Sequence, residues 1–345
     1  THHEDFYVRF PSSDGRRIAY HAGADLYVFD PLTNASTRVD VCFSSSRPQR
    51  NRKFVPAART LESTDVHPAG HSLVFASRGG VFAGALFDGP PARLGLPSGV
   101  RYRLPRWLAD GRRVVAVTDE GGEESLVVLS ADGAEPPRRI AGDVGRALDL
   151  VVAPSGGDVV ALSNQRQEVI VADLATGTTK VLEKCAFDRI GGLAFSPDGR
   201  WLAYGFNDVR AASSIHVADV RTSAVRRVTR PDFRDASPAF DPEGRYLYFV
   251  SGRVFDPVYD SHYFDLGFPK GSRPYLIPLT KHVVSPFAST TRAPRGPEAS
   301  AATTAATAAA AVESATGPAS DKAAAPPPPP ALAIDFDGIE DRVVA

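Results

Sequence analysis

The sequence predicts an all-β fold, and within that class a β-propeller of four-stranded blades. Three observations predict it: turn glycines recur along the chain, short β-rich runs flank each turn, and no amphipathic helical periodicity is present. The intervals between successive turn glycines are 55, 41, 45, 43 and 45 residues. Four of these five intervals match the roughly 40–45 residues of one propeller blade, which disfavours a β-sandwich or a β-solenoid. The turn glycines are Gly15, Gly70, Gly111, Gly156, Gly199 and Gly244.

The chemistry of the turns explains which residues recur. The clearest copy is the turn Ser196-Pro197-Asp198-Gly199, which lies between two apolar runs. Pro presets φ, Asp hydrogen-bonds its own backbone and Gly accepts a positive φ, so this turn favours a β-hairpin. Each copy is followed by a further β-rich run and, in most copies, by a short strand of basic and apolar residues. Each repeat therefore predicts four strands.

The first interval between turn glycines is irregular. It contains a polar, basic stretch without β-rich character, which is typical of a connection. We therefore interpret residues 1–43 as the last blade of one propeller, 44–54 as a linker and 55–287 as five blades of a second propeller. A long loop between two blades of a single propeller is the alternative that the spacing leaves open.

The composition changes abruptly near the C-terminal end. Residues 288–331 hold 17 Ala, 8 Pro and 10 Ser or Thr among 44 positions. Such a segment buries too little apolar surface to offset the entropy of ordering, so we expect a disordered insertion. Apolar residues resume at Leu332, and we expect residues 332–345 to form the first strand of a further blade. The sequence Asp335-Phe336-Asp337-Gly338 lacks the spacing of a calcium loop and indicates a turn.

Residues 251–269 are rich in aromatic side chains, which alternate with Asp, His and Arg. This stretch takes the place of a connection that is short in the other repeats. Large aromatic side chains are usually buried. We therefore favour an inserted hairpin whose aromatic residues pack on a neighbouring blade, and a loop that contacts a substrate at the rim of the propeller is the alternative.

Motifs that would carry chemistry are absent. The sequence has no nucleophile elbow, no glycine-rich phosphate loop and no His-Glu-x-x-His zinc motif. His67 and His71 have a spacing that suits a metal on a helix, but a predicted hairpin turn separates them. Cys42 and Cys185 are too few for a disulfide framework and favour a reducing, cytoplasmic location. We expect no catalytic residue, no metal site and no cofactor in this chain.

Charge and hydropathy bear on the partners. The 39 basic and 40 acidic side chains give a net charge of −1, which argues against a broad electrostatic grip on nucleic acid or an anionic membrane. The sequence contains no run of about 18 apolar residues that could span a membrane. We therefore expect neither nucleic acid nor a membrane as a partner. The chain contains no Met, not even at position 1, and we interpret it as a fragment of a longer protein.

Several stretches resemble tricorn proteases. The most specific runs from Arg230-Pro231-Asp232-Phe233 through Phe255-Asp256-Pro257-Val258-Tyr259 to Leu276 and resembles the propeller region of that family. Residues 334–344 resemble the strand that follows a variable linker there, and residues 14–29 resemble the end of the preceding propeller. The Ala- and Pro-rich segment is longer than the connection expected at its place.

The resemblance implies a large cytoplasmic serine peptidase that assembles as a hexamer and trims oligopeptides. Tricorn proteases carry a six-bladed propeller, a seven-bladed propeller and a PDZ domain flanked by two catalytic subdomains. On that plan, residues 1–43 end the six-bladed propeller and residues 55–287 supply five blades of the seven. The catalytic residues would lie beyond Ala345. The resemblance thus implies a non-catalytic propeller that gates the access of oligopeptides to a catalytic domain outside this chain.

A gating role directs attention to the innermost strands, because these surround the central tunnel of a propeller. In this type of repeat the strand before each hairpin turn is expected to be innermost. Mixed charge on these strands would pass polar, extended peptides without holding any one tightly. The substrate-channel candidates are Asp65, Arg106, Asp149 and Asp235.

Other interpretations stay open. A freestanding propeller that binds proteins is the main alternative. A propeller enzyme with its own site would need converging carboxylates or metal ligands, and no convincing set is present. A propeller of the prolyl-oligopeptidase type would need an α/β-hydrolase domain with a nucleophile elbow downstream.

Overall fold

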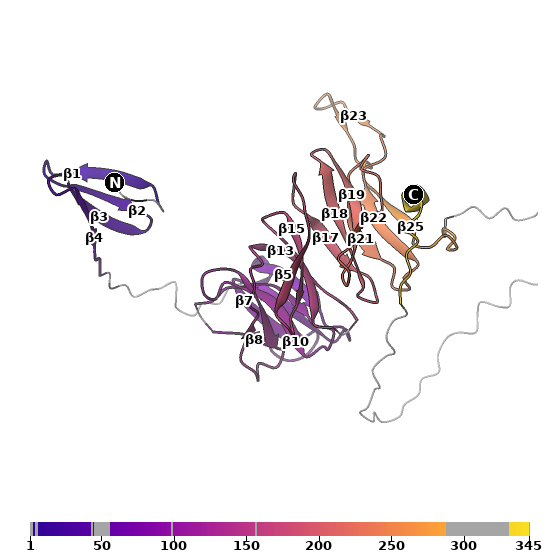
Figure 1. Ribbon diagram of the computed structural model, residues 1–345, viewed down its shortest axis with the longest axis horizontal. Helices are drawn as coiled ribbons and strands as arrows, with labels where there is room; N and C mark the ends of the chain where they lie inside the picture. Colours follow the sequence, from indigo (N-terminus) through magenta and orange to yellow (C-terminus); the bar gives the residue numbers. More distant parts are fainter. Residues whose placement is uncertain are drawn as a thin grey trace, which may run out of the picture. The chain divides into compact units, whose positions relative to one another are not determined.

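The computed structural model describes residues 3, 6–42, 44, 56–97, 99–155, 157–287 and 331–344. The chain forms two compact units, Thr1–Pro56 and Ala57–Ala345. Both consist of antiparallel β-sheets (Figure 1), which confirms the predicted all-β propeller architecture. The predicted linker 44–54 and the predicted disordered insertion 288–331 lie outside the described residues, apart from Ser44 and Ala331.

The first unit is a single sheet with the strand order β1-β2-β3-β4. Of its described residues, only Tyr20 and Ala22 are buried, whereas Phe10 is 77% exposed. The sheet therefore has almost no core of its own. Its strands are β1 (Val8–Ser13), β2 (Ile18–Ala22), β3 (Asp25–Asp30) and β4 (Ala35–Val39).

The second unit begins with a short 3₁₀ helix, η2 (Ala57–Arg59), and continues with sheets of consecutive antiparallel strands. Sheet one holds β5 (Leu61–Val66), β6 (Ser72–Ser77), β7 (Gly80–Ala85) and β8 (Ala92–Leu94). Sheet two holds β9 (Tyr102–Trp107), β10 (Arg113–Thr118), β11 (Ser125–Ser130) and β12 (Arg138–Arg139). Sheet three holds β13 (Ala147–Val152), β14 (Val159–Asn164), β15 (Glu168–Asp173) and β16 (Thr178–Lys184).

Sheets four and five complete the described part of this unit. Sheet four holds β17 (Gly191–Phe195), β18 (Trp201–Val209), β19 (Ala212–Asp219) and β20 (Val225–Arg227). Sheet five holds β21 (Asp235–Phe240), β22 (Tyr246–Ser251) and β25 (Arg273–Pro278). Between β22 and β25 the chain makes a separate hairpin of β23 (Val258–Asp260) and β24 (Asp265–Gly267), and η3 (Ile339–Arg342) is a 3₁₀ helix near the C-terminal end.

The segment that we expected to open a further blade instead joins sheet five. Val344 and Leu276 exchange two backbone hydrogen bonds, each of 2.9 Å, in an antiparallel bridge. Val344 therefore lies beside β25, on the edge opposite β22. The physical reason is that β25 has an unpaired edge, and a returning segment satisfies backbone groups there.

The hairpin turns follow the predicted chemistry. At the turn between β9 and β10, Asp110 Oδ1 accepts hydrogen bonds from the backbone N–H groups of Arg112 and Arg113, at 2.8 and 3.0 Å. Gly111 has φ +65°, a conformation that residues with a Cβ rarely adopt. Local chemistry thus specifies where the chain reverses.

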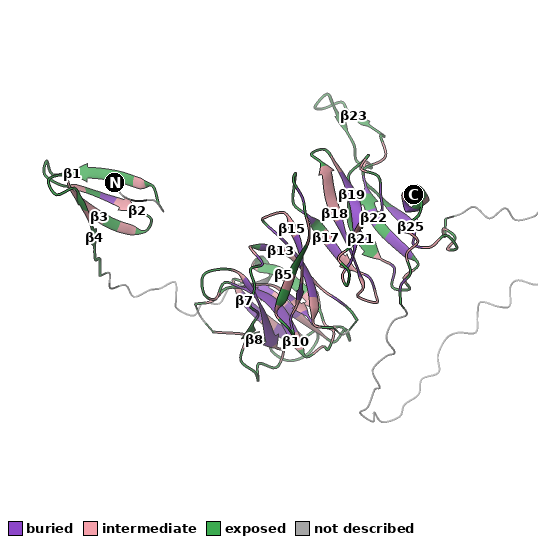
Figure 2. Cartoon of the chain, viewed as in Figure 1, coloured by how far each residue is buried: buried purple, intermediate pink, exposed green. Residues whose placement is uncertain are grey.

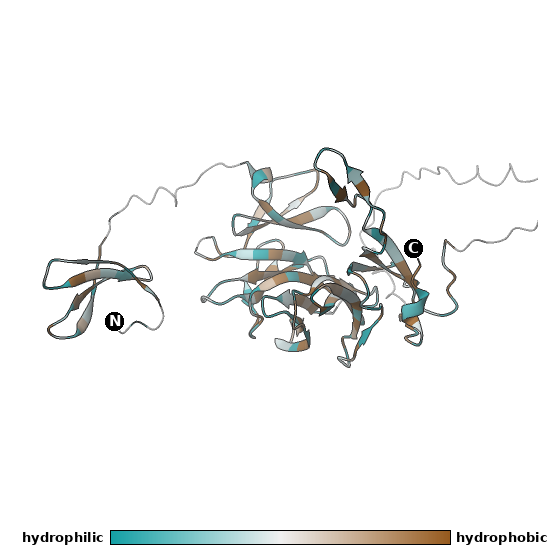
Figure 3. Cartoon of the chain, turned by 90° about the horizontal axis from the view of Figure 1, so that it is seen from above, coloured by the Kyte–Doolittle hydropathy of each residue, from teal (hydrophilic) through white to brown (hydrophobic). Residues whose placement is uncertain are grey.

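The core lies between neighbouring sheets, and the middle strands serve two cores at once. Val114 and Ala116 of β10 pack in the cluster shared by sheets one and two. Val115 and Val117 of the same strand pack in the cluster shared by sheets two and three. Successive side chains of a strand point to opposite faces, so both faces of β10 are buried. Figure 2 shows this burial in the middle strands, and Figure 3 shows hydrophobic and hydrophilic residues alternating along many strands.

The inserted hairpin is present, but its aromatic side chains are not buried. All six residues of β23 and β24 are exposed, and Tyr263 and Phe264 between them are 77% and 78% exposed. The expectation that these rings pack on a neighbouring blade was therefore wrong. The hairpin projects from sheet five (Figures 1 and 2), and a two-stranded ribbon has no second layer to bury its side chains.

A β-bulge recurs in the first strand of every main sheet. In four sheets a bulge residue has a positive φ, at Phe10, Leu104, Gly192 and Ser237. Phe10, Leu104 and Ser237 are each followed by Pro. A bulge interrupts the hydrogen-bond ladder, so a residue without an N–H is tolerated there. In the second unit these first strands pack against one another from sheet to sheet and form one row.

None of the helical segments in the described parts of the chain has the length and apolar character that crossing a lipid bilayer requires.

Candidate functional site

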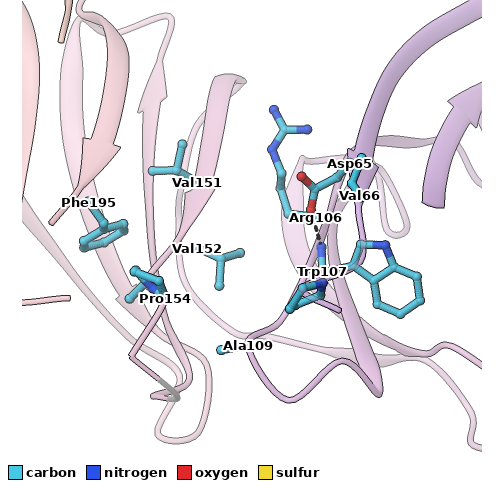
Figure 4. A pocket seen from close by; sticks show the side chains of 11 residues that line it. Asp65, Val66, Arg106, Trp107, Ala109, Val151, Val152, Pro154 and Phe195 are labelled. Carbon is cyan, nitrogen blue, oxygen red and sulfur yellow. Dashed lines mark hydrogen bonds between the residues drawn. The ribbon is translucent and has the colours of Figure 1, made fainter. Parts of the chain in front are cut away.

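The first strands of four successive sheets share a cavity of about 390 Å³. Figure 4 shows Val151, Val152 and Phe195 on one side of it, and Asp65 and Arg106 on the other. The apolar side comes from sheets three and four, and the charged side comes from sheets one and two. The row of first strands thus brings together side chains that lie about 40 residues apart in sequence, as the blade period requires.

Asp65 is held by the neighbouring sheet. Its Oδ2 accepts a hydrogen bond of 2.8 Å from the backbone N–H of Trp107, shown by the dashed line in Figure 4. Burial raises the pKa of the Asp65 carboxyl, and this effect outweighs the opposing hydrogen bond from Trp107 and the charge of Arg106. The carboxylate therefore stands in an environment that disfavours its charge.

Arg106 ties three sheets together through backbone carbonyls. Its Nε donates to Leu150 O of sheet three at 2.9 Å, and its Nη1 donates to Thr64 O of sheet one at 3.3 Å. Nη1 also donates to Pro105 O at 3.2 Å. Arg106 lies at the cavity, and its guanidinium also fixes the spacing of the first strands.

The other two channel candidates do not line this cavity. Asp149 is half-buried, and its Oδ1 accepts the N–H of the next residue, Leu150, at 2.9 Å. Asp235 is 0% exposed and pairs with Arg253 Nη2 at 2.8 Å. A fully buried carboxylate needs such a partner, because an unpaired buried charge is costly. Asp235 therefore links β21 to the residues after β22 and does not face an open passage.

The histidine pair forms part of the hairpin turn. The rings of His67 and His71 lie 4.0 Å apart between centroids. His67 Nε2 donates to Gly111 O at 2.9 Å, and its Nδ1 accepts the N–H of Ala69 at 3.0 Å, so both ring nitrogens are engaged. Across the residues that the structure describes, no three His, Cys, Asp or Glu side chains are arranged to hold a metal ion.

Sequence reasoning missed the apolar side of the cavity and the partner of Asp235. Val151, Val152 and Phe195 read as ordinary strand residues, and only the packing of the first strands brings them together. Arg253 stood out only as part of an aromatic-rich stretch. The Pro residues after Leu104 and Ser237 were a usable signal, because Pro within a predicted strand indicates a bulge.

The cavity carries no nucleophile with an adjacent base and no carboxylate pair among its described lining residues. What it offers is an apolar surface opposite a polar one.

Comparison with known proteins identifies relatives of this chain. Residues 61–345 match the family described as the tricorn protease second β-propeller domain. A tricorn protease homolog of Saccharolobus solfataricus is 35% identical over 287 residues, which cover 83% of this chain and 26% of the relative. Tricorn protease homolog 1 of Streptomyces coelicolor is 35% identical over 348 residues, which cover 99% of this chain and 31% of the relative.

A solved structure agrees with these relatives. The crystal structure of the tricorn protease superposes with a TM-score of 0.62 at 25% sequence identity, over 85% of this chain and 29% of that chain. The chain thus spans less than a third of these proteins.

Proposed function

The chain belongs to the tricorn protease family, and from this premise we propose that residues 57–344 are part of a propeller that conducts oligopeptides toward a catalytic domain outside this chain. The observation that carries the proposal is the cavity shared by the first strands of four successive sheets. Val152 and Phe195 offer contact to apolar side chains of a peptide, and Asp65 and Arg106 keep the opposite side polar. Such a mixed wall admits peptides of varied sequence without binding any one tightly.

The proposal extends to the parent protein. We propose a serine-type peptidase that assembles as a hexamer in the cytoplasm, with its catalytic residues in the part that this chain does not span. In this proposal residues 1–43 are the last blade of a six-bladed propeller, 44–54 a linker and 55–287 five blades of a seven-bladed propeller. The support is the family membership and the division of the chain after Pro56.

Narrowing the cavity tests the conducting role. Ala109 lines the cavity and belongs to none of the buried clusters (Figure 4), so Ala109→Trp places a large side chain inside with little disturbance of the core. In the full-length peptidase we expect kcat/KM for long peptides to fall about tenfold and kcat/KM for peptides of a few residues to change less than about twofold. Hydrolysis of fluorogenic peptides of graded length measures both.

A matched control is Ala175→Trp. Ala175 is exposed in the turn between β15 and β16 and is not among the residues that line the cavity, so the same substitution there should leave both rates unchanged. Equal losses for long and short peptides in the Ala109 variant, with an unchanged melting temperature, would rule out a conducting role for the cavity.

The interaction-module alternative has one observation in its favour. The projecting β23–β24 hairpin and the residues before it expose large apolar side chains, including Phe255 at 81% and Tyr259 at 60%. Exposed aromatic residues of this kind are enriched at protein interfaces. A full-length protein that retains this propeller and hydrolyses no peptide would favour the alternative.

A further inference from the structure

Residues 331–344, here named the clasp, dock against sheets four and five as one continuous segment. The clasp is connected to the preceding residues only through 288–330, and its described contacts with the sheets are all non-covalent. It therefore meets the sheets as a linear peptide meets a groove. The groove lies between the hairpin turns of sheets four and five at one end and β25 at the other.

Leu332 anchors the start of the clasp. Its N–H donates to Asp198 Oδ2 at 2.8 Å, and its carbonyl accepts a hydrogen bond of 3.2 Å from Trp201 Nε1. Asp198 and Trp201 belong to the hairpin of sheet four. On the other side, a Cβ on Gly244 in the hairpin turn of sheet five would lie 2.6 Å from Leu332 Cδ1. Leu332 is 7% exposed and thus fills a notch between the two turns that a glycine leaves open.

A second apolar anchor follows. The ring of Phe336 lies 5.4 Å from the ring of Trp201, and the guanidinium of Arg226 lies 5.3 Å from the centroid of the same Phe336 ring. Ile339 is 2% exposed and belongs to the core cluster that sheets four and five share. Burial of an apolar side chain of this size stabilises the docked clasp.

Backbone pairing holds the clasp in register. Asp335 N–H donates to Leu279 O at 2.9 Å, just after β25. Lys281 N–H donates to Asp335 Oδ2 at 3.0 Å, and Val344 pairs with Leu276. The clasp is therefore bound at both ends by main-chain hydrogen bonds, as in peptide recognition by strand addition.

Charge complementarity accompanies these contacts. The clasp is acidic, and the groove presents basic side chains to it: Glu340 pairs with Arg227 at 3.1 Å and Asp337 pairs with Lys281 at 2.7 Å. Asp341 pairs with Arg230. These pairs are largely exposed, so they add little to stability, but they favour an acidic segment over a basic one.

We propose that the groove between sheets four and five is a binding site for a linear, acidic and apolar peptide, and that the clasp occupies it as a separable ligand. The clasp stays bound when the connection through residues 288–330 is cut. The groove also accepts the same sequence supplied as a free peptide. This inference is independent of the conducting role, because no clasp residue lines the cavity of the first strands.

Cleavage of the connection tests the proposal. A recognition sequence for a specific protease is inserted within residues 300–310 of the full chain, and the folded protein is cut. We expect the C-terminal piece to elute with the rest of the chain in size-exclusion chromatography. A labelled synthetic peptide of residues 331–345 should then displace the C-terminal piece and bind in the groove. Raising the salt concentration should lower the affinity of the labelled peptide for the groove, because the exposed charge pairs are screened.

Peptide variants distinguish specific from nonspecific binding. The substitutions are in the free peptide, so the folding of the groove is unaffected. The Leu332→Asp peptide should compete at least about tenfold less well than the unchanged peptide, because it places a charge in the buried notch. The control is the Ala333→Asp peptide, which adds the same charge at an exposed neighbouring position and should compete within about twofold of the unchanged peptide. Release of the C-terminal piece on cutting, loss of β-structure after cutting, or equal competition by the two variant peptides would each overturn the proposal.

Discussion

The half-buried Asp65 and the buried Asp219 show how local surroundings decide whether a carboxyl pKa is raised or lowered. Burial raises the pKa of Asp65, and the backbone hydrogen bonds from Trp107 and Val66 and the charge of Arg106 do not offset it. Burial also tends to raise the pKa of Asp219, but hydrogen bonds from Arg200 at 2.8 and 3.0 Å and from two backbone N–H groups outweigh it, so this pKa is lowered. The same residue type thus destabilises the fold when ionised at one site and stabilises it at the other.

Replacing each carboxylate by its amide should have opposite consequences. Asp219→Asn should lower the free energy of unfolding at neutral pH by about 1–3 kcal/mol, because it removes a charge-assisted hydrogen bond. A lowered pKa stabilises the fold above the pKa of the unfolded chain, about 4, and that stability is lost as the pH falls through the folded value, so the loss should shrink in acid.

Asp65→Asn should not lower stability at neutral pH. The raised pKa means that ionisation costs stability as the pH rises through it, and the amide oxygen still accepts the N–H of Trp107. Urea denaturation between neutral and acidic pH measures both variants. Equal losses of unfolding free energy in the two variants at neutral pH would contradict the expectation that ionised Asp219 stabilises the fold and ionised Asp65 destabilises it.

At the scale of elements, the bulged first strand is the feature that sets how closely the sheets approach. Gly192 in β17 has φ +67°, and a Cβ there would lie 3.0 Å from Ser237 Cα and 3.2 Å from Ser237 N in β21. The two bulges therefore touch backbone to backbone. The turn glycines were recognisable from spacing, whereas Gly192 was not, because its role depends on a residue in the next sheet.

Gly192→Ala should destabilise the second unit by about 2 kcal/mol or more, since it combines a left-handed backbone with an overlap against main-chain atoms. The adjacent Gly191→Ala is the control. A Cβ on Gly191 meets nothing within 4 Å, and its effect should stay within about 0.5 kcal/mol. Chemical denaturation followed by circular dichroism compares the two, and similar losses in both variants would mean that the bulges do not limit the approach of the sheets.

For the whole molecule, the two units differ in how far they bury their own apolar surface. The second unit has continuous cores between its neighbouring sheets. The first unit is one sheet with Phe6, Tyr7 and Phe10 exposed at 63%, 86% and 77%. A single sheet without a packing partner lacks the second layer that folded domains require.

We therefore expect residues 1–43 alone to be unfolded or aggregated in water, and residues 57–345 alone to retain β-structure. Circular dichroism and size-exclusion chromatography of the two polypeptides measure this. A reversible, cooperative melt of residues 1–43 as a monomer would show that the sheet needs no neighbouring blade.

The all-β class, the four-stranded repeats and the positions of the hairpin turns were predictable from the sequence, because turn chemistry and strand alternation are local. The sequence also placed Asp65 and Arg106 on first strands. Three features follow only from the packing of the folded chain: Val152 and Phe195 share a cavity with these residues, Asp235 is buried against Arg253, and Val344 joins β25. These outcomes depend on residues distant in the chain, where packing and the need to satisfy buried polar groups prevail over local pattern.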